Sequence, residues 1–199
     1  MYTLVATLDG YTNSITTTQF SPDKAYLASG SEDGSLSIHS VSNWEPLLRF
    51  VDASPITSLV WHPTSMGLLL CGCKSGDVHT IRFSASSVCS RYHQHRTSVL
   101  TNKTQKDVRM WTDETPDQIQ CLAHHKRKNS LAVGCGNDVL LVDYETSEEG
   151  KSSWTRKTTL PSPPRLPGSN GFLPNPIARS ISFLKGNHLL VSYLDHGIV

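Results

Sequence analysis

The amino-acid sequence predicts an all-β fold, and three observations support this prediction. Short segments rich in β-branched and small residues, such as "ITTTQF" and "SLSIHS", recur along the chain. Turn-forming combinations, such as Ser-Pro-Asp at 21–23 and Glu-Asp-Gly at 32–34, separate these segments. No segment of useful length shows helical periodicity. We therefore expect short strands joined by tight turns.

The same pattern of residues recurs along the chain. Residues 15–38 align with residues 56–81, and the leading residues Ile15 and Ile56 are 41 positions apart. In both copies the leading residue is followed five positions later by an aromatic residue, then by a turn, a strand that ends in Gly, and a Gly-containing turn. A third copy begins at Ile119 and a fourth near Ala178. Such periodicity indicates a repeat architecture.

The copies divide the chain into repeats and inserts within a single domain, residues 1–199. The expected repeats are about 9–51, 52–100, 117–159 and 177–199. Two inserts are expected at 84–117 and 145–176, the second of them Pro-rich over 160–176. Each repeat is expected to supply three short strands, with the outer strand of the second repeat inside the first insert. The N-terminal segment "MYTLVATL" alternates like a further outer strand.

The first copy, "FSPDKAYLASGSEDGSLSI" at 20–38, resembles a WD repeat, the unit of a β-propeller. Gly10-Tyr11 stands four residues before Ile15, where that family usually has Gly-His. The resemblance implies a WD-type propeller with about three and a half to four blades in this chain, where propellers typically have four to eight. We therefore expect an incomplete propeller, closed by further blades or by a second chain.

The departures from the family pattern concern its buried hydrogen-bonded residues. The Trp-Asp signature is absent, and its positions hold His39-Ser40, Ile81-Arg82 and Val142-Asp143. The resemblance implies that the first repeat keeps part of the buried polar set with other ring donors. These structural positions are Tyr11, Ser29, Asp33 and His39. In the second copy neither ring is available, so apolar packing by Ile81 is expected to compensate.

Composition favours a soluble intracellular protein. Lys and Arg number 18 against 17 Asp and Glu, so the net charge of +1 gives no support to nucleic-acid binding. No signal-peptide pattern or long apolar run is present. The odd count of five Cys fits reduced thiols in the cytoplasm or nucleus. We expect no contact with membrane or nucleic acid.

Motifs that carry chemistry are weak in this sequence. Cys89, His93 and His95 could suggest metal ligands, but a structural zinc site usually requires a fourth ligand and a paired-Cys knuckle. Cys71 and Cys73 flank a strand-end glycine and are interpreted as core residues. The basic segment 124–128 is interpreted as a solvated turn, and the PxxP spacing in 161–167 as a loop between blades. We expect no catalytic residue, cofactor or metal.

The sequence therefore favours a non-catalytic scaffold for protein–protein interactions, with an unidentified protein partner. Contacts are expected from loops before the inner strands and from the tight turns. The candidate positions are Asn13, Glu32, Asp52, Lys74, Asn137 and Arg179. Two alternatives stay open: a propeller-type enzyme or metal-binding module that uses the 84–117 insert, and a sensor segment of a larger receptor.

Overall fold

The computed structural model describes residues 3–64, 67–82, 118–146, 152–160, 162–163, 176–185, 188–194 and 197–198. The described residues form strands β1 to β14 and contain no α-helix. Within them, no helix is long and apolar enough to cross a membrane. The prediction of an all-β chain is confirmed.

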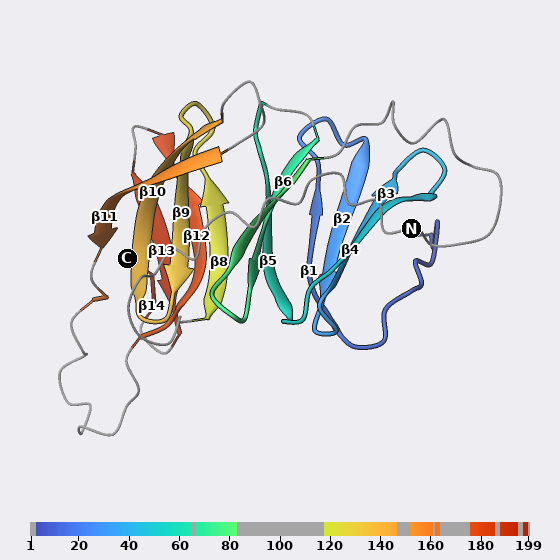
Figure 1. The fold of residues 1–199 in the computed structure, drawn as a ribbon, viewed down its shortest axis with the longest axis horizontal. Coiled ribbons are helices and arrows are strands. Elements are labelled where there is room, and N and C mark those ends of the chain that lie inside the picture. Colours follow the sequence, from blue (N-terminus) through green and yellow to red (C-terminus); the bar gives the residue numbers. More distant parts are fainter. Residues whose placement is uncertain are drawn as a thin grey trace.

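The strands form four antiparallel sheets that follow one another in chain order (Figure 1). The first contains β1 (Ile15–Phe20), β2 (Tyr26–Ser31), β3 (Ser35–Ser40) and β4 (Pro46–Val51). The second contains β5 (Ile56–Trp61), β6 (Leu68–Cys73) and β7 (Val78–Arg82). The third contains β8 (Ile119–His124), β9 (Ser130–Cys135), β10 (Asp138–Thr146) and β11 (Ser152–Leu160). The fourth contains β12 (Ala178–Phe183), β13 (Leu189–Tyr193) and β14 (Gly197–Ile198).

Each sheet begins with the same irregularity in strand pairing. The register between the first and second strand of every sheet shifts just after the leading residue, which is Ile15, Ile56, Ile119 or Ala178. A bulge at this point increases the local twist of the strand. The four sheets therefore share one backbone design, including the fourth copy, whose sequence is the most divergent.

A second repeated feature closes one end of every sheet. In each sheet, the residue just after the second strand donates its backbone N–H to the carbonyl of the residue just before the first strand, at 2.8–3.3 Å. The four pairs are Glu32–Ser14, Lys74–Pro55, Gly136–Gln118 and Leu194–Ile177. These contacts fix the loop before each sheet against the turn that follows its second strand. The turns β2–β3, β6–β7 and β9–β10 lie along the lower edge of Figure 1.

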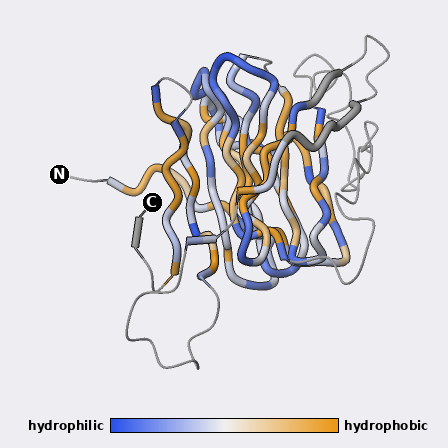
Figure 2. Tube along the Cα trace, turned by 90° about the vertical axis from the view of Figure 1, so that its left-hand side faces the viewer, coloured by the Kyte–Doolittle hydropathy of each residue, from blue (hydrophilic) through white to orange (hydrophobic). Residues whose placement is uncertain are grey.

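The hydrophobic core lies between consecutive sheets. One cluster joins the first and second sheets through residues such as Ile38, Ile56 and Leu69, each fully buried. Two further clusters join the second sheet to the third and the third to the fourth. Along β6, Leu69 belongs to the first cluster and Leu70 to the second, because side chains alternate between the faces of a strand. Figure 2 shows this apolar interior, with hydrophilic residues at the turns.

Glycines set how closely the sheets approach. A Cβ at Gly30 would lie 2.6 Å from Ile56 Cγ2, and a Cβ at Gly72 would lie 2.4 Å from Ile119 Cγ2. At Gly134 the corresponding distance to Ala178 Cβ is 3.2 Å. The leading residues of the second, third and fourth sheets therefore pack onto the glycine near the end of the second strand in the preceding sheet, which explains why the repeated pattern has glycine there.

Hydrogen bonds between the first strands reinforce this packing. Thr16 Oγ1 donates to the carbonyl of Ile56, and Trp61 Nε1 donates to the carbonyl of Gln19 at 3.0 Å. The backbone N–H of Leu122 donates to Ser58 Oγ at 3.0 Å. The partners lie in matching order along β1, β5 and β8, so these strands run parallel to one another through the stack.

Two segments differ from the expected boundaries. The N-terminal segment from residue 3 to residue 14 contains no strand, and Leu4 and Val5 are 87% and 73% exposed because no neighbouring strand covers them. Part of the expected 145–176 insert belongs to the third sheet, because β11 pairs with β10 from Thr146–Ser152 to Val139–Leu160. The 84–117 insert lies outside the described residues, as do most residues of the Pro-rich segment.

Gly72→Ala should destabilise the protein by about 1–3 kcal/mol, because overpacking forces the strands apart. Chemical denaturation would measure the loss. The same substitution in an Ile119→Ala background should cost clearly less, since the atom it meets has been removed. Equal costs in both backgrounds would show that the Gly72–Ile119 contact does not limit the approach of the sheets.

Candidate functional site

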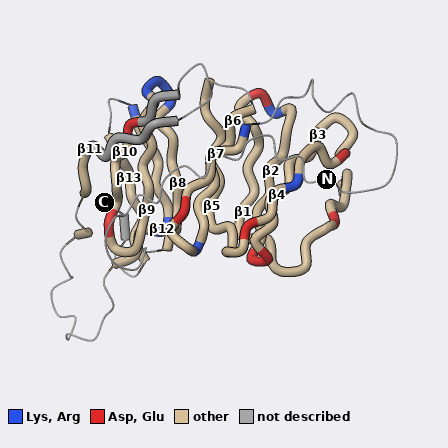
Figure 3. Tube along the Cα trace, viewed as in Figure 1, with Lys and Arg blue, Asp and Glu red and all other residues tan. Residues whose placement is uncertain are grey.

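The candidate site is the lower edge of the stack, where the loops before the sheets meet the turns. Four of the six predicted contact residues are exposed there: Asn13, Glu32, Lys74 and Arg179. Asn137 lies in the β9–β10 turn and is half-buried. The structure thus brings these positions to one edge through the repeated loop–turn hydrogen bonds. Figure 3 shows that charged residues lie mainly at the ends of the strands.

The sixth residue, Asp52, is oriented differently. Its carboxylate Oδ2 lies 3.0 Å from His79 Nε2, and the side chain is only 15% exposed. The β2–β3 turn positions it: the N–H of Asp52 donates to the carbonyl of Gly34 at 2.9 Å. Gly34 has a φ of +79° and a Cβ there would meet the Asp52 carbonyl oxygen at 2.2 Å, so only glycine fits. Asp52 therefore belongs to the interior of the second sheet's polar network.

In the first sheet, a tyrosine takes part in the buried polar set. The Tyr11 hydroxyl donates to the carbonyl of Ser29 at 3.0 Å and also contacts Ser29 Oγ. Asp33 accepts hydrogen bonds from the N–H and hydroxyl of Thr12 and from Ser35. Burial opposes ionisation of Asp33, but these hydrogen bonds prevail and lower its pKa. The network ties the N-terminal loop to β2 and to the β2–β3 turn.

His39 is buried at the end of β3 at the position of the family's Trp. Only 4% of the residue is exposed, and its Nδ1 has no hydrogen-bond partner among the described residues. Burial lowers the pKa of His39, because a charged ring would be desolvated. The partner of Ser29 is thus Tyr11 and not His39. His39 is buried as an uncharged ring and stabilises the blade through packing.

The second sheet contains a polar cluster that sequence reasoning missed. Asp52, Cys73 and His79 place one ligand-type atom each within 4.8 Å of one another. His79 pairs with Cys71 across β6 and β7, which is the position of Ser37 in the first sheet. At the position of the family's Trp, Ile81 packs in the core as expected, whereas the ring of His79 lies two residues earlier in the chain.

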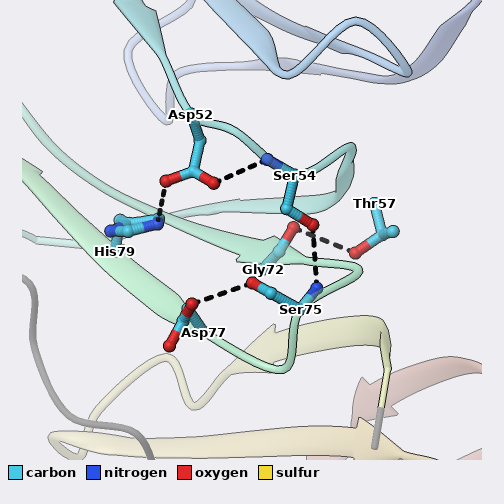
Figure 4. Close-up of polar contacts among 7 residues, drawn as sticks. All are labelled: Asp52, Ser54, Thr57, Gly72, Ser75, Asp77 and His79. Carbon is cyan, nitrogen blue, oxygen red and sulfur yellow. Dashed lines mark hydrogen bonds and ion pairs between the residues drawn. The ribbon is translucent and has the colours of Figure 1, made fainter. Parts of the chain in front are cut away.

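Hydrogen bonds hold the loop beneath this cluster (Figure 4). The N–H of Ser54 donates to Asp52 Oδ1 at 2.8 Å, and Ser54 Oγ accepts from the N–H of Ser75 at 2.9 Å. Ser75 Oγ donates to Asp77 Oδ2 at 2.8 Å. The loop after β4 and the β6–β7 turn are therefore held in one arrangement.

The predicted basic turn is at the opposite, upper edge of the stack (Figure 3). Residues 126–128 are exposed, as a solvated turn requires. His124 was expected in this turn, but it ends β8 and is 9% exposed, at the position that Trp61 occupies in β5. Its ring lies 4.6 Å from that of His62, centroid to centroid. The third copy thus uses histidine where other copies use a larger aromatic residue.

The comparisons with known proteins agree with this architecture. Residues 2–40 match the family model "WD domain, G-beta repeat". The chain is 24% identical over 163 residues to Protein FIZZY-RELATED 1 of Arabidopsis thaliana, an alignment that covers 68% of this chain and 34% of that protein. The chain therefore spans about a third of the curated relative's length.

A solved structure with a similar fold is a chain of the Crystal Structure of Mitotic Checkpoint Complex. It superposes with a TM-score of 0.68 at 15% sequence identity, covering 98% of this chain and 50% of that one. Together with the repeated sheets and their loop–turn contacts, this defines a segment of a β-propeller whose sheets are its blades. The WD-repeat resemblance of the first copy is thus matched by the family model over residues 2–40, and the described sheets have the fold of β-propeller blades.

Tyr11→Phe should lower the free energy of unfolding by about 0.5–1.5 kcal/mol, the usual net value of a neutral hydrogen bond. Thermal or denaturant unfolding would measure the change. Ser42→Ala, which alters an exposed turn hydroxyl bonded to Ser40, should have a smaller effect and serves as the control. If the two substitutions had equal effects, the Tyr11–Ser29 contact would not stabilise the first blade.

Stability should fall as the pH drops from about 6.5 towards 4. Burial lowers the pKa of His124 from 6.5 to about 4, helped by the charges of His62 and His125. The unfolded chain therefore binds a proton in this window that the folded chain excludes, which corresponds to about 3 kcal/mol at the acidic end. Urea denaturation at several pH values would measure the loss.

His124→Phe supplies the matched test of that pH dependence, since Phe20 and Phe183 occupy this position in other blades. The variant should lose part of the dependence between pH 6.5 and 4, while substitution of the exposed His188 by Gln should leave it unchanged. An unaltered pH profile in His124→Phe would contradict the assignment.

Proposed function

We propose that the chain is part of a non-catalytic scaffold that binds other proteins through the lower edge of its blades. The observation that carries the proposal is the rigid presentation of exposed polar side chains at this edge. Glu32 and Lys74 lie in the β2–β3 and β6–β7 turns, and the N–H of each donates to the loop before the first strand of its sheet. Side chains that are held in place lose little conformational entropy when a partner binds.

The mixed charge of this edge favours a polar, complementary protein surface as its partner. Asn13, Glu32, Lys74 and Arg179 are distributed over three blades, so one partner segment would contact several blades at once. Exposed loops on a rigid framework are frequent binding positions. A similarly folded chain is part of a mitotic checkpoint complex, which supports a role in protein assembly.

A charge swap at the lower edge should abolish partner binding without changing stability or net charge. In Glu32→Lys/Lys74→Glu, both exposed side chains are reversed, so steering and pairing with a complementary surface are lost. Affinity purification from cells, with quantitative mass spectrometry, would compare the co-purifying proteins with those of the wild type. The expected result is loss of a specific set of proteins.

The matched control is Glu45→Lys/Arg127→Glu, which makes the same swap at exposed turns of the upper edge. It should retain the set of partners that the lower-edge variant loses. If the control loses the partners and the lower-edge variant retains them, the proposed binding edge is wrong. Circular dichroism of both variants would verify that each is folded.

A further inference from the structure

Three ligand-type groups converge inside the second blade, outside the exposed binding edge. Asp52 follows β4, Cys73 ends β6 and His79 lies in β7, so three separate segments bring them together. A carboxylate oxygen, the thiol sulfur and a ring nitrogen lie within 4.8 Å of one another. Cys73 is fully buried and His79 is 2% exposed. Figure 4 shows the Asp52 carboxylate directed at the His79 ring.

The hydrogen bonding of His79 is incomplete. Its Nδ1 has no hydrogen-bond partner among the described residues. Its Nε2 lies 3.0 Å from Asp52 Oδ2 but not in the alignment of a hydrogen bond. Phe50 packs near the ring, with centroids 5.2 Å apart. The His79 ring also interacts with the Cys73 side chain. A buried ring nitrogen without a hydrogen-bond partner, such as Nδ1, is costly and favours a further ligand at this cluster.

Neighbouring groups orient the other two side chains. The Ser54 N–H occupies Asp52 Oδ1, which leaves Oδ2 to face the cluster. Cys71 is hydrogen-bonded to Cys73, an interaction that raises the pKa of the Cys71 thiol and lowers that of Cys73. Burial opposes ionisation of His79, but Cys73 and Asp52 raise its pKa. Such outer contacts around metal ligands fix their orientation.

We propose that Asp52, Cys73 and His79 bind a zinc ion within the second blade. Zinc is bound in proteins by thiolate, imidazole and carboxylate ligands, usually four in a tetrahedron. One thiolate and one carboxylate neutralise the charge of the ion, which favours its burial. Binding releases the thiol proton of Cys73 to solvent, and a water molecule that enters beside the partly exposed Asp52 completes the tetrahedron.

The other described blades lack this combination of residues at the matching positions. In the first blade Ser31 and Ser37 take the places of Cys73 and His79. In the third blade Cys135 and Leu140 take them. Cys135 is therefore a buried cysteine at the same position of the fold without the histidine. A bound ion would link the loop after β4 to β6 and β7 in the second blade alone.

Cobalt and zinc titrations of the purified, metal-free full chain test the proposal. One equivalent of Co²⁺ should bind, with a thiolate-to-cobalt charge-transfer band and the visible bands of tetrahedral cobalt, and Zn²⁺ should displace it. Cys73→Ser should abolish the charge-transfer band. His79→Leu introduces the residue found at this position in the third blade. It should weaken metal binding by at least about tenfold, because losing even a contact that only orients a ligand typically costs that much affinity.

Two cysteine variants are the matched controls, Cys135→Ser in the third blade and Cys89→Ser in the 84–117 insert. Both should keep the cobalt spectrum, and zinc should raise their melting temperatures as it does for the wild type. Zinc should not raise the melting temperature of His79→Leu. The proposal is overturned if folded wild-type protein shows no thiolate–cobalt band, or if the band persists in Cys73→Ser and disappears in either control.

Discussion

The structure depends on one repeated contact, the packing of the first residue of each blade onto the glycine at the end of the preceding blade's second strand. Ile56 on Gly30 and Ile119 on Gly72 leave no space for a Cβ. This close approach lets buried cores form between the blades and brings Thr16 and Ser58 within hydrogen-bond distance of the next first strand. Because the contact needs only a glycine and a small or β-branched residue, it survives extensive sequence drift.

The departures from the WD-repeat pattern concern mainly the polar residues inside each blade. The first blade uses the Tyr11 hydroxyl against Ser29, whereas the second uses the pairing of Asp52 with His79. The third places Leu140 opposite Val133, where the second has His79 opposite Cys71. The polar contacts therefore differ from blade to blade, whereas the strand pairing and the glycine packing are repeated. The lower edge thus keeps its rigidity without the family's signature residues.

The sequence was sufficient for the all-β fold and its short strands, because these follow from local patterns. Turn residues, the alternation of apolar and polar side chains, and the glycines near the strand ends can each be recognised within a few consecutive residues. The Asp52–Cys73–His79 cluster could not be predicted in that way, since it joins the loop before β5 to two strands, β6 and β7, and depends on side-chain direction. His124 was assigned to a turn because its basic neighbours suggested solvent, whereas contact with His62 buries it in β8. The segment "MYTLVATL" alternates like a strand, but its described residues, from residue 3 on, form none.

Hydrogen exchange of the native protein tests most directly whether contact between the first strands holds the blades together. Hydrogen bonds join β1 to β5 and β5 to β8, and the glycine contacts join β2 to β5 and β6 to β8. The amides of β1, β5 and β8 should therefore exchange slowest and with a common opening free energy. Gly72→Ala should lower this protection in β5 and β8 together. Independent opening of each blade, with Gly72→Ala affecting β6 alone, would contradict the account.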